Sequence, residues 1–211
     1  MPKKMLRARS DDGLRDCLSS HRHKASGIGV WHLLDHSPKR DVPTDAYAWV
    51  IATYCNPHHG TFVPALGLHY VAFAKLIVSL FPHFKAPQSW LAAQQSTIVN
   101  DGVLNEFSDL LKLLLDYCAI ADEHHRNVAH LVATACMGSD HLWQDLGLPD
   151  RKALSTLLSD HFPLLAEKNT GDMKWKKFFY KQLCEREGIN ACRSPSCAAC
   201  CDYKKCFGPE E

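Results

Sequence analysis

Four cysteines near the C-terminus follow the spacing C-x4-C-x2-C-x5-C, and this short segment constrains the chain more than any other. They are Cys192, Cys197, Cys200 and Cys206, with a fifth thiol at Cys201 beside the third. The residues between them are small, polar or turn-forming, which suits a backbone that curves around a metal centre. Thiolates are soft ligands, so this density of cysteine predicts a metal or metal-cluster site. The segment is expected to form an irregular, metal-binding tail.

The spacing alone leaves zinc and an iron–sulfur cluster equally open, and a ligand-free or disulfide role is less favoured. Closed zinc sites with four cysteines usually contain two C-x2-C pairs, whereas this segment contains one. The bacterial ferredoxin spacing C-x2-C-x2-C does not match either. Cys201 is able to exchange with Cys200 as a ligand. Cys184 precedes the tail on a predicted helix and is interpreted as a core thiol, with an auxiliary role at the cluster as the alternative.

Charge and hydropathy argue against several classes of protein. A formal net charge of +1 over 211 residues argues against a nucleic-acid binder that neutralises many phosphates. The apolar stretch 63–81 contains His69 and Lys75, so it predicts a buried helix rather than a membrane span. The basic N-terminus is not followed by an apolar run, which argues against a signal peptide. We therefore expect the reducing cytoplasm, where clustered cysteines usually bind metal.

The pattern of apolar residues predicts an all-α protein in three parts. Residues 1–40 are polar and are expected to form a mobile arm, 41–188 a helical bundle, and 189–211 the cysteine-rich cluster-binding tail. No alternating strand pattern occurs, and the short connections favour a bundle of about five to seven helices. Thr44 and Asp172 are predicted helix caps, and the apolar segment 66–80 is predicted to be the central helix. The expected helices cover residues 30–36, 46–54, 66–80, 103–118, 122–136, 154–162 and 173–187.

Histidines and lysines give weaker signals. The histidine pairs lack the H-E-x-x-H order of zinc proteases, so we interpret them as solvated or as satisfied helix-end residues. An imidazole that completes the coordination of a heterometal stays open as the one metal role; the histidines concerned are His32, His36, His124, His125 and His130, with Glu123 beside His124. The lysines between 174 and 181 predict a mostly solvated helix face close to the tail. They could attract an oxyanion or an acidic partner protein; they are Lys174, Lys176, Lys177 and Lys181.

No arrangement typical of an enzyme is present in the sequence. The chain has no glycine-rich phosphate loop, no nucleophile with a plausible base and no suitably spaced pair of carboxylates. The sequence therefore predicts a binding or carrier protein.

Three stretches around the cysteines form a recognisable set. They are Asp140-His-Leu-Trp-Gln-Asp-Leu-Gly-Leu148, Met173-Lys-Trp-Lys-Lys-Phe-Phe-Tyr-Lys-Gln-Leu-Cys184, and the ending Cys206-Phe-Gly-Pro-Glu-Glu211. In this order, together with the cysteine spacing, they resemble the NifQ family, the molybdenum-handling proteins of nitrogenase cofactor biosynthesis. The resemblance covers about the last third of the chain closely and the preceding helical region loosely.

The resemblance implies a specific role for the tail. It implies that Cys192, Cys197, Cys200 and Cys206 bind a molybdenum–iron–sulfur cluster, although the doubled Cys200-Cys201 is not a feature we associate with the family. It also implies that molybdenum, acquired from molybdate or another donor, passes to the nitrogenase cofactor assembly proteins. The alternatives are a zinc-stabilised protein-interaction module, whose metal stays in place, and an iron–sulfur redox carrier.

Overall fold

The computed structural model describes residues 28–97, 101–188, 200 and 203–210, and all regular structure within these ranges is helical. This confirms the all-α prediction. In chain order the elements are α2 Val30–Leu34, α3 Val42–Tyr54, the 3-10 turn η1 Pro64–Gly67, α4 Tyr70–Leu80, α5 Gln88–Ala93, α6 Asp101–Asp116, α7 Glu123–Cys136, α8 Leu142–Asp145, α9 Arg151–His161, α10 Pro163–Ala166, α11 Trp175–Arg186 and α12 Tyr203–Phe207. Within the described ranges, no helix is long and apolar enough to cross a membrane.

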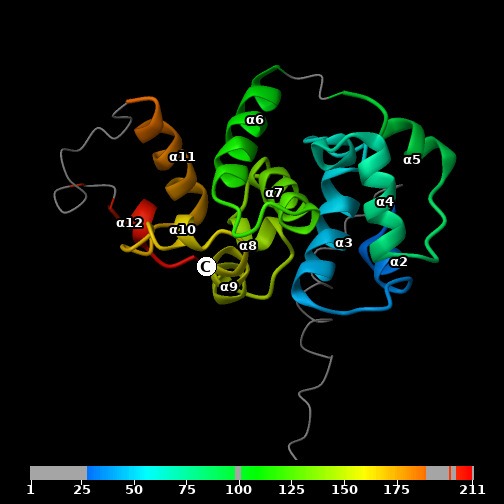
Figure 1. Ribbon diagram of the computed structural model, residues 1–211, viewed down its shortest axis with the longest axis horizontal. Helices are drawn as coiled ribbons and strands as arrows, with labels where there is room; N and C mark the ends of the chain where they lie inside the picture. Colours follow the sequence, from blue (N-terminus) through cyan, green and yellow to red (C-terminus); the bar gives the residue numbers. More distant parts are fainter. Residues whose placement is uncertain (1–27, 98–100, 189–199, 201–202, 211) are drawn as a thin grey trace, which may run out of the picture.

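Helix α7 is the central element of the bundle. It packs against α3, η1, α6 and α8, with α2–α5 at one end of the molecule and α10–α12 at the other (Figure 1). Asp122 caps it by accepting the backbone N–H of His125 at 2.8 Å, which confirms the predicted start. Leu131 and Val132 are completely buried. Burying such side chains contributes about 1.5–3 kcal/mol each, which makes α7 the main source of core packing.

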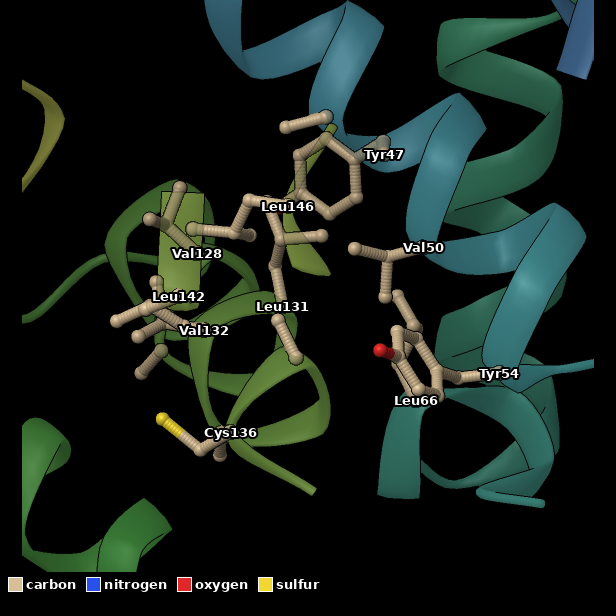
Figure 2. Close-up of a cluster of buried hydrophobic side chains, with 14 of the residues drawn as sticks. Tyr47, Val50, Tyr54, Leu66, Val128, Leu131, Val132, Cys136, Leu142 and Leu146 are labelled. Atoms are coloured by element: carbon tan, nitrogen blue, oxygen red, sulfur yellow. The ribbon is translucent and has the colours of Figure 1, made fainter. Parts of the chain in front are cut away.

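The core around α7 joins side chains from distant parts of the sequence. Val128, Leu131 and Val132 from α7 meet Leu142 from α8 and Leu146 just after it (Figure 2). Tyr47, Val50 and Tyr54 of α3 close the core from the other side, with Leu66 of η1 beside them.

The prediction of one central helix over 66–80 was wrong. The backbone at Ala65, Leu66 and Gly67 has φ angles of 53°, 55° and 68°, and the helix begins only at Tyr70. α4 lies at the edge of the bundle, because Val71 and Val78 are 54% and 65% exposed. A nearly continuous apolar run has no distinct polar and apolar faces. It therefore predicts burial but does not show which face of the helix is buried.

Two predicted helix caps were also wrong. The side chain of Asp41, rather than Thr44, caps α3 by accepting the N–H of Thr44 at 3.0 Å. Helix α11 begins at Trp175 after Lys174, whose side chain makes no capping hydrogen bond. Asp172 instead has a φ of 52° and lies in the turn before the helix. In both cases several polar residues precede the helix, and residue type alone does not determine which of them starts it.

The two ends of the chain differ from the simple three-part scheme. Residues 28–40, assigned from sequence to the N-terminal arm, include α2, which confirms the short helix predicted over 30–36. Its Leu33 and Leu34 are buried, and it packs against α3; residues 1–27 lie outside the described part. The tail was predicted to be irregular, but Tyr203–Phe207 form the short helix α12. Its folding there depends on contacts with the bundle.

Candidate metal site at the C-terminal helix

The structure describes two of the four predicted cysteine ligands. Cys200 and Cys206 are partly buried free thiols, whereas Cys192, Cys197 and the neighbouring Cys201 lie outside the described residues. Among the side chains that the structure does describe, no group of three or more His, Cys, Asp or Glu is placed to hold a metal ion. The four-cysteine ligand set therefore stays a prediction.

Helix α12 holds Cys206 at the edge of the bundle. The carbonyl oxygen of Cys206 accepts a hydrogen bond of 2.8 Å from the backbone N–H of Lys174, at the start of α11. Phe207 packs against the core, and a Cβ added to Gly171 would lie 3.2 Å from its ring. Tyr203 stacks on Phe207 with ring centroids 4.5 Å apart. One potential ligand is thus attached to the folded body of the protein.

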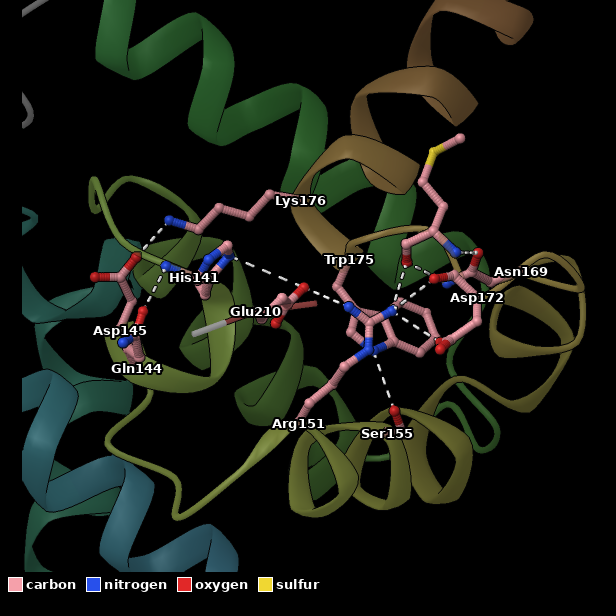
Figure 3. A network of polar contacts seen from close by, with 11 residues as sticks. His141, Gln144, Asp145, Arg151, Ser155, Asn169, Asp172, Trp175, Lys176 and Glu210 are labelled. Atoms are coloured by element: carbon pink, nitrogen blue, oxygen red, sulfur yellow. Dashed lines mark hydrogen bonds and ion pairs between the residues drawn. The ribbon is translucent and has the colours of Figure 1, made fainter. Parts of the chain in front are cut away.

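Arg151 is the centre of the polar network beside α12 (Figure 3). Its Nη2 donates to the carbonyl oxygens of Asp172 and Met173 at 2.9 Å each and to the Asp172 carboxylate at 2.8 Å. Its Nη1 donates to Glu210, whose side chain is only 5% exposed. Asn169 fixes Met173 through two further hydrogen bonds of 2.8 Å. Neither Arg151 nor Glu210 is marked by a local sequence pattern, because their pairing spans 59 residues.

Lys176 was predicted to belong to a solvated lysine face, and this was wrong. Its side chain is 18% exposed and forms an ion pair with Asp145, whose side chain is 5% exposed. Lys176 also donates to the carbonyl oxygen of Gly138 at 2.8 Å. The ion pair joins the two aromatic-rich motifs that precede the cysteines, so Lys176 holds the fold together rather than offering charge to a ligand.

A cleft of about 460 Å³ lies beside α12, at the start of α11. We call it the lysine cleft. Four lysines and two carboxylates, Asp140 and Glu210, line it. Glu210 is paired with Arg151 and Lys176 with Asp145, so the other three lysines outnumber Asp140. Its wall therefore carries an excess of positive charge, which favours anions. The four lysines are Lys174, Lys176, Lys177 and Lys205.

Most of the candidate histidines have local partners. His130 Nδ1 lies 3.0 Å from the carbonyl oxygen of Leu66, and burial lowers its pKa. His32 and His36 pack around the ring of Phe84, with ring centroids 5.4 Å and 6.4 Å from it. His130 therefore differs from the prediction, since it lies in the middle of α7 and contacts a carbonyl 64 residues away. The contacts with Phe84 place the other two in an aromatic cluster.

A second histidine group, which we call the histidine cluster, consists of His124, His125 and His161. The ring centroid of His161 lies 5.2 Å from that of His124 and 5.0 Å from that of His125. His125 Nδ1 also lies 2.7 Å from the Asp122 carboxylate. Burial, with the neighbouring His124 and His125, lowers the pKa of His161 to about 4. His161 was not a sequence candidate, since it comes from a different helix.

The remaining cysteines divide by burial. Cys55 and Cys136 are buried free thiols, and burial raises the pKa of each to about 12. Both are core residues, at 0% and 3% exposed. Cys118 on the α6 side and Cys184 on α11 are only partly buried. The sequence-based interpretation of Cys184 as a core thiol is therefore wrong, because this side chain is only partly buried.

The architecture defines a class of protein: a helical scaffold that carries a cysteine-rich segment at its edge. The NifQ family model matches residues 46–208. The chain is 42% identical over 163 residues to Protein NifQ of Azotobacter vinelandii, covering 74% of this chain and 80% of that protein. It is 31% identical over 172 residues to Protein NifQ of Rhodobacter capsulatus, a match that covers 80% of this chain and 92% of that protein. The chain belongs to the NifQ family.

Family membership implies a role in nitrogen fixation, in the biosynthesis of the nitrogenase cofactor. The chain is also 47% identical over 81 residues to Protein NifQ of Klebsiella pneumoniae. This shorter match covers 38% of this chain and 48% of that protein. No solved structure matches the chain. The family match includes all four cysteines of the predicted ligand set and ends before Glu210.

Proposed function

We propose that this protein carries a molybdenum–iron–sulfur cluster as cargo and supplies molybdenum for assembly of the nitrogenase iron–molybdenum cofactor. The observation that supports the proposal best is the position of Cys206. It belongs to the four-cysteine spacing inside the family match, and it is a free, partly buried thiol on a helix docked at the edge of the bundle. A carrier needs ligands that are held in place and yet reachable by donor and receiver.

The chemistry of the donors fits such a cargo. Thiolates are the usual ligands of iron–sulfur clusters and suit reduced molybdenum as well. The described Cys200 and Cys206 are both free thiols. A thiolate-bound cluster also requires reducing conditions, which is why we place the protein in the cytoplasm.

The lysine cleft is proposed as the place where the molybdenum source or the receiving protein approaches. Lys176 is occupied by Asp145, so the electrostatic attraction is assigned to Lys174 and Lys177 on the wall of the cleft. Molybdate is a dianion, and an acidic surface of a cofactor assembly protein would meet the same charge. In this role the protein takes up and releases metal without turning over a substrate, so we propose that it is not an enzyme.

Metal content tests the proposal directly. The protein is purified without oxygen from cells supplied with molybdate, and iron, molybdenum and zinc are counted per chain by mass spectrometry. Iron together with molybdenum is expected in the native protein, with both lost in Cys197→Ser and Cys206→Ser at unchanged helical content. Cys118→Ser, which alters a partly buried thiol of the bundle, is the matched control and is expected to keep both metals.

Other outcomes identify the competing functions. Zinc alone, near one ion per chain in a colourless protein, would replace the carrier role with a zinc-stabilised interaction module. Iron without molybdenum, with reversible one-electron chemistry, would indicate a redox carrier. A loss of metal in Cys184→Ser or Cys201→Ser would add that residue to the ligand set.

A further inference from the structure

We propose that Arg151 and Glu210 are positioning residues for Cys206, and that their contact holds α12 on the bundle whether or not metal is bound. The importance of this thiol rests on the proposed function, whereas the contact itself is a property of the metal-free chain. Glu210 follows Cys206 by four residues, and Arg151 begins α9. The pair therefore links the cysteine-bearing helix to the helical scaffold.

The burial of Glu210 is the first observation that supports this role. Glutamate is almost never buried without a partner, because removing a carboxylate from water costs several kcal/mol. Glu210 is nevertheless 5% exposed, with Arg151 as its ion-pair partner and His141 Nδ1 3.9 Å away. Its second oxygen, Oε2, is buried and has no hydrogen-bond partner among the residues that the structure describes. The Arg151 contact is therefore the main interaction that offsets the cost of burying this side chain.

Arg151 is itself held in a fixed orientation. Its Nη2 reaches the carbonyl oxygens of Asp172 and Met173, and Asp150 caps the helix that carries it by accepting the N–H of Ala153 at 2.7 Å. A guanidinium is a rigid planar fork, so fixing one nitrogen also fixes the direction of the other. The contacts of Nη2 thus orient Nη1 toward Glu210 independently of the Glu210 contact itself.

The same contacts continue to Cys206. Arg151 holds the turn at Asp172 and Met173, and the next residue, Lys174, donates its backbone N–H to the carbonyl oxygen of Cys206 at 2.8 Å. Figure 3 shows Glu210 between Arg151 and His141, at the point where the chain leaves α12. The backbone around Cys206 is therefore held at two points: by the hydrogen bond to the Cys206 carbonyl oxygen and by the ion pair of Glu210, four residues later. Such an arrangement reduces the ordering cost of binding a metal.

Loss of the Arg151–Glu210 contact should release α12 locally. The helix would lose its ion-paired anchor while keeping its hydrogen bond to Lys174 and the packing of Cys206 and Phe207, and elements with few buried contacts open at low free-energy cost. Cys206 would then be exposed more often. In a loaded protein, one ligand would also leave the cluster more often.

Thiol alkylation in the metal-free, reduced protein measures this opening. The rate at Cys206 is followed by peptide mass spectrometry, with Cys184 on α11 as the internal reference in the same chain. In Glu210→Gln and Glu210→Ala we expect alkylation of Cys206 to accelerate by about tenfold, which corresponds to about 1.4 kcal/mol of opening free energy. The rate at Cys184 is expected to stay the same.

Two further variants separate positioning from general instability. Arg186→Met removes an ion pair with Asp116 in which both side chains are more exposed, at 32% and 49%, and is expected to leave both rates unchanged. Arg151→Lys retains positive charge but loses the fork, so it is expected to fall between the native protein and Glu210→Ala. Should an Arg151 variant fail to fold, the two Glu210 variants decide the question.

Unchanged alkylation of Cys206 in both Glu210 variants, at native helical content, overturns the proposal. Failure of the carrier function gives a different result. If no iron or molybdenum is ever bound but Cys206 alkylation accelerates, the positioning role stands and the cargo is wrong. If the native protein binds both metals, Glu210→Gln is expected to release them to a chelator faster. If the variant instead releases the metals at the native rate and Cys206 alkylation is unchanged, the positioning role is rejected and the carrier function stands.

Discussion

The hydroxyl of Tyr54 donates a hydrogen bond of 2.6 Å to the carboxylate of Asp145, which lies 91 residues further along the chain. The other oxygen of Asp145 pairs with Lys176, so one buried carboxylate joins α3, α8 and α11. Burial, followed by the hydrogen bond to Asp145, raises the pKa of Tyr54 and keeps its proton available for this bond. The contact connects the central core to the helix that precedes the cysteine tail.

Replacing Lys176 by Met should destabilise the protein strongly. The substitution leaves the Asp145 carboxylate buried without its counter-charge, which costs about 3–5 kcal/mol. Tyr54→Phe removes one hydrogen bond to the charged group and should cost about 2 kcal/mol. Urea denaturation of the metal-free proteins measures both. The matched control is Lys181→Met, whose exposed lysine lies 3.7 Å from Glu185 and should change stability by less than about 1 kcal/mol. A Lys176 variant as stable as this control would contradict the prediction.

Gly147→Ala should destabilise the turn after α8. Gly147 has a φ of +66°, and an added Cβ would lie 2.4 Å from the Trp49 ring. Left-handed strain and overpacking together should cost about 2 kcal/mol or more. Gly60→Ala serves as control, since no atom lies within 4 Å of an added Cβ there, and it should change stability by no more than about 0.5 kcal/mol. Thermal or urea unfolding distinguishes the two, and equal stability would show that Trp49 moves aside freely.

The histidine cluster should make the protein less stable in mild acid. Burial and the neighbouring His124 and His125 lower the pKa of His161 from 6.5 to about 4, against the weaker opposing effect of Asp160 and Asp122. Between these values the unfolded chain binds a proton that the folded chain does not, so stability falls as the pH decreases from about 6.5 to about 4.

Unfolding free energies of the native protein and of His161→Phe, measured from pH 7.5 downward, test this effect. The variant retains an aromatic ring but cannot titrate, so its stability should decline less steeply over that interval. Parallel curves for the two proteins would assign the acid sensitivity to other groups.

Thiol reactivity should follow burial in the metal-free protein. Cys55 and Cys136 are enclosed, with the pKa of each raised to about 12, and should resist alkylation until the protein unfolds. Cys184, Cys200 and Cys206 are partly accessible and should react in the native state. After cluster loading, protection is expected at Cys200 and Cys206, whereas protection of Cys184 as well would identify it as an auxiliary ligand. Peptide mass spectrometry after timed alkylation measures each site.

Local patterns were enough to predict much of the helical framework. The cap at Asp122 and the periodic apolar residues of α7 lie within a few residues of one another, so the sequence determines that helix directly. The motifs around the cysteines were sufficient to identify the family, which the comparisons confirm. By contrast, the segment 66–80 is apolar along most of its length, and its exposed position could not be inferred without knowing its neighbours.

By itself, then, the sequence determined the all-helical class, the family and the cysteines proposed to hold the cargo, because these depend on residue type and short spacing. Only the tertiary structure decided that Lys176 is paired with Asp145 and that Arg151 binds Glu210. When two charged residues are far apart in the chain, no local sequence pattern shows that they form an ion pair. Whether a lysine faces solvent or a buried carboxylate depends on which helices meet, and that choice is made by packing of the whole core.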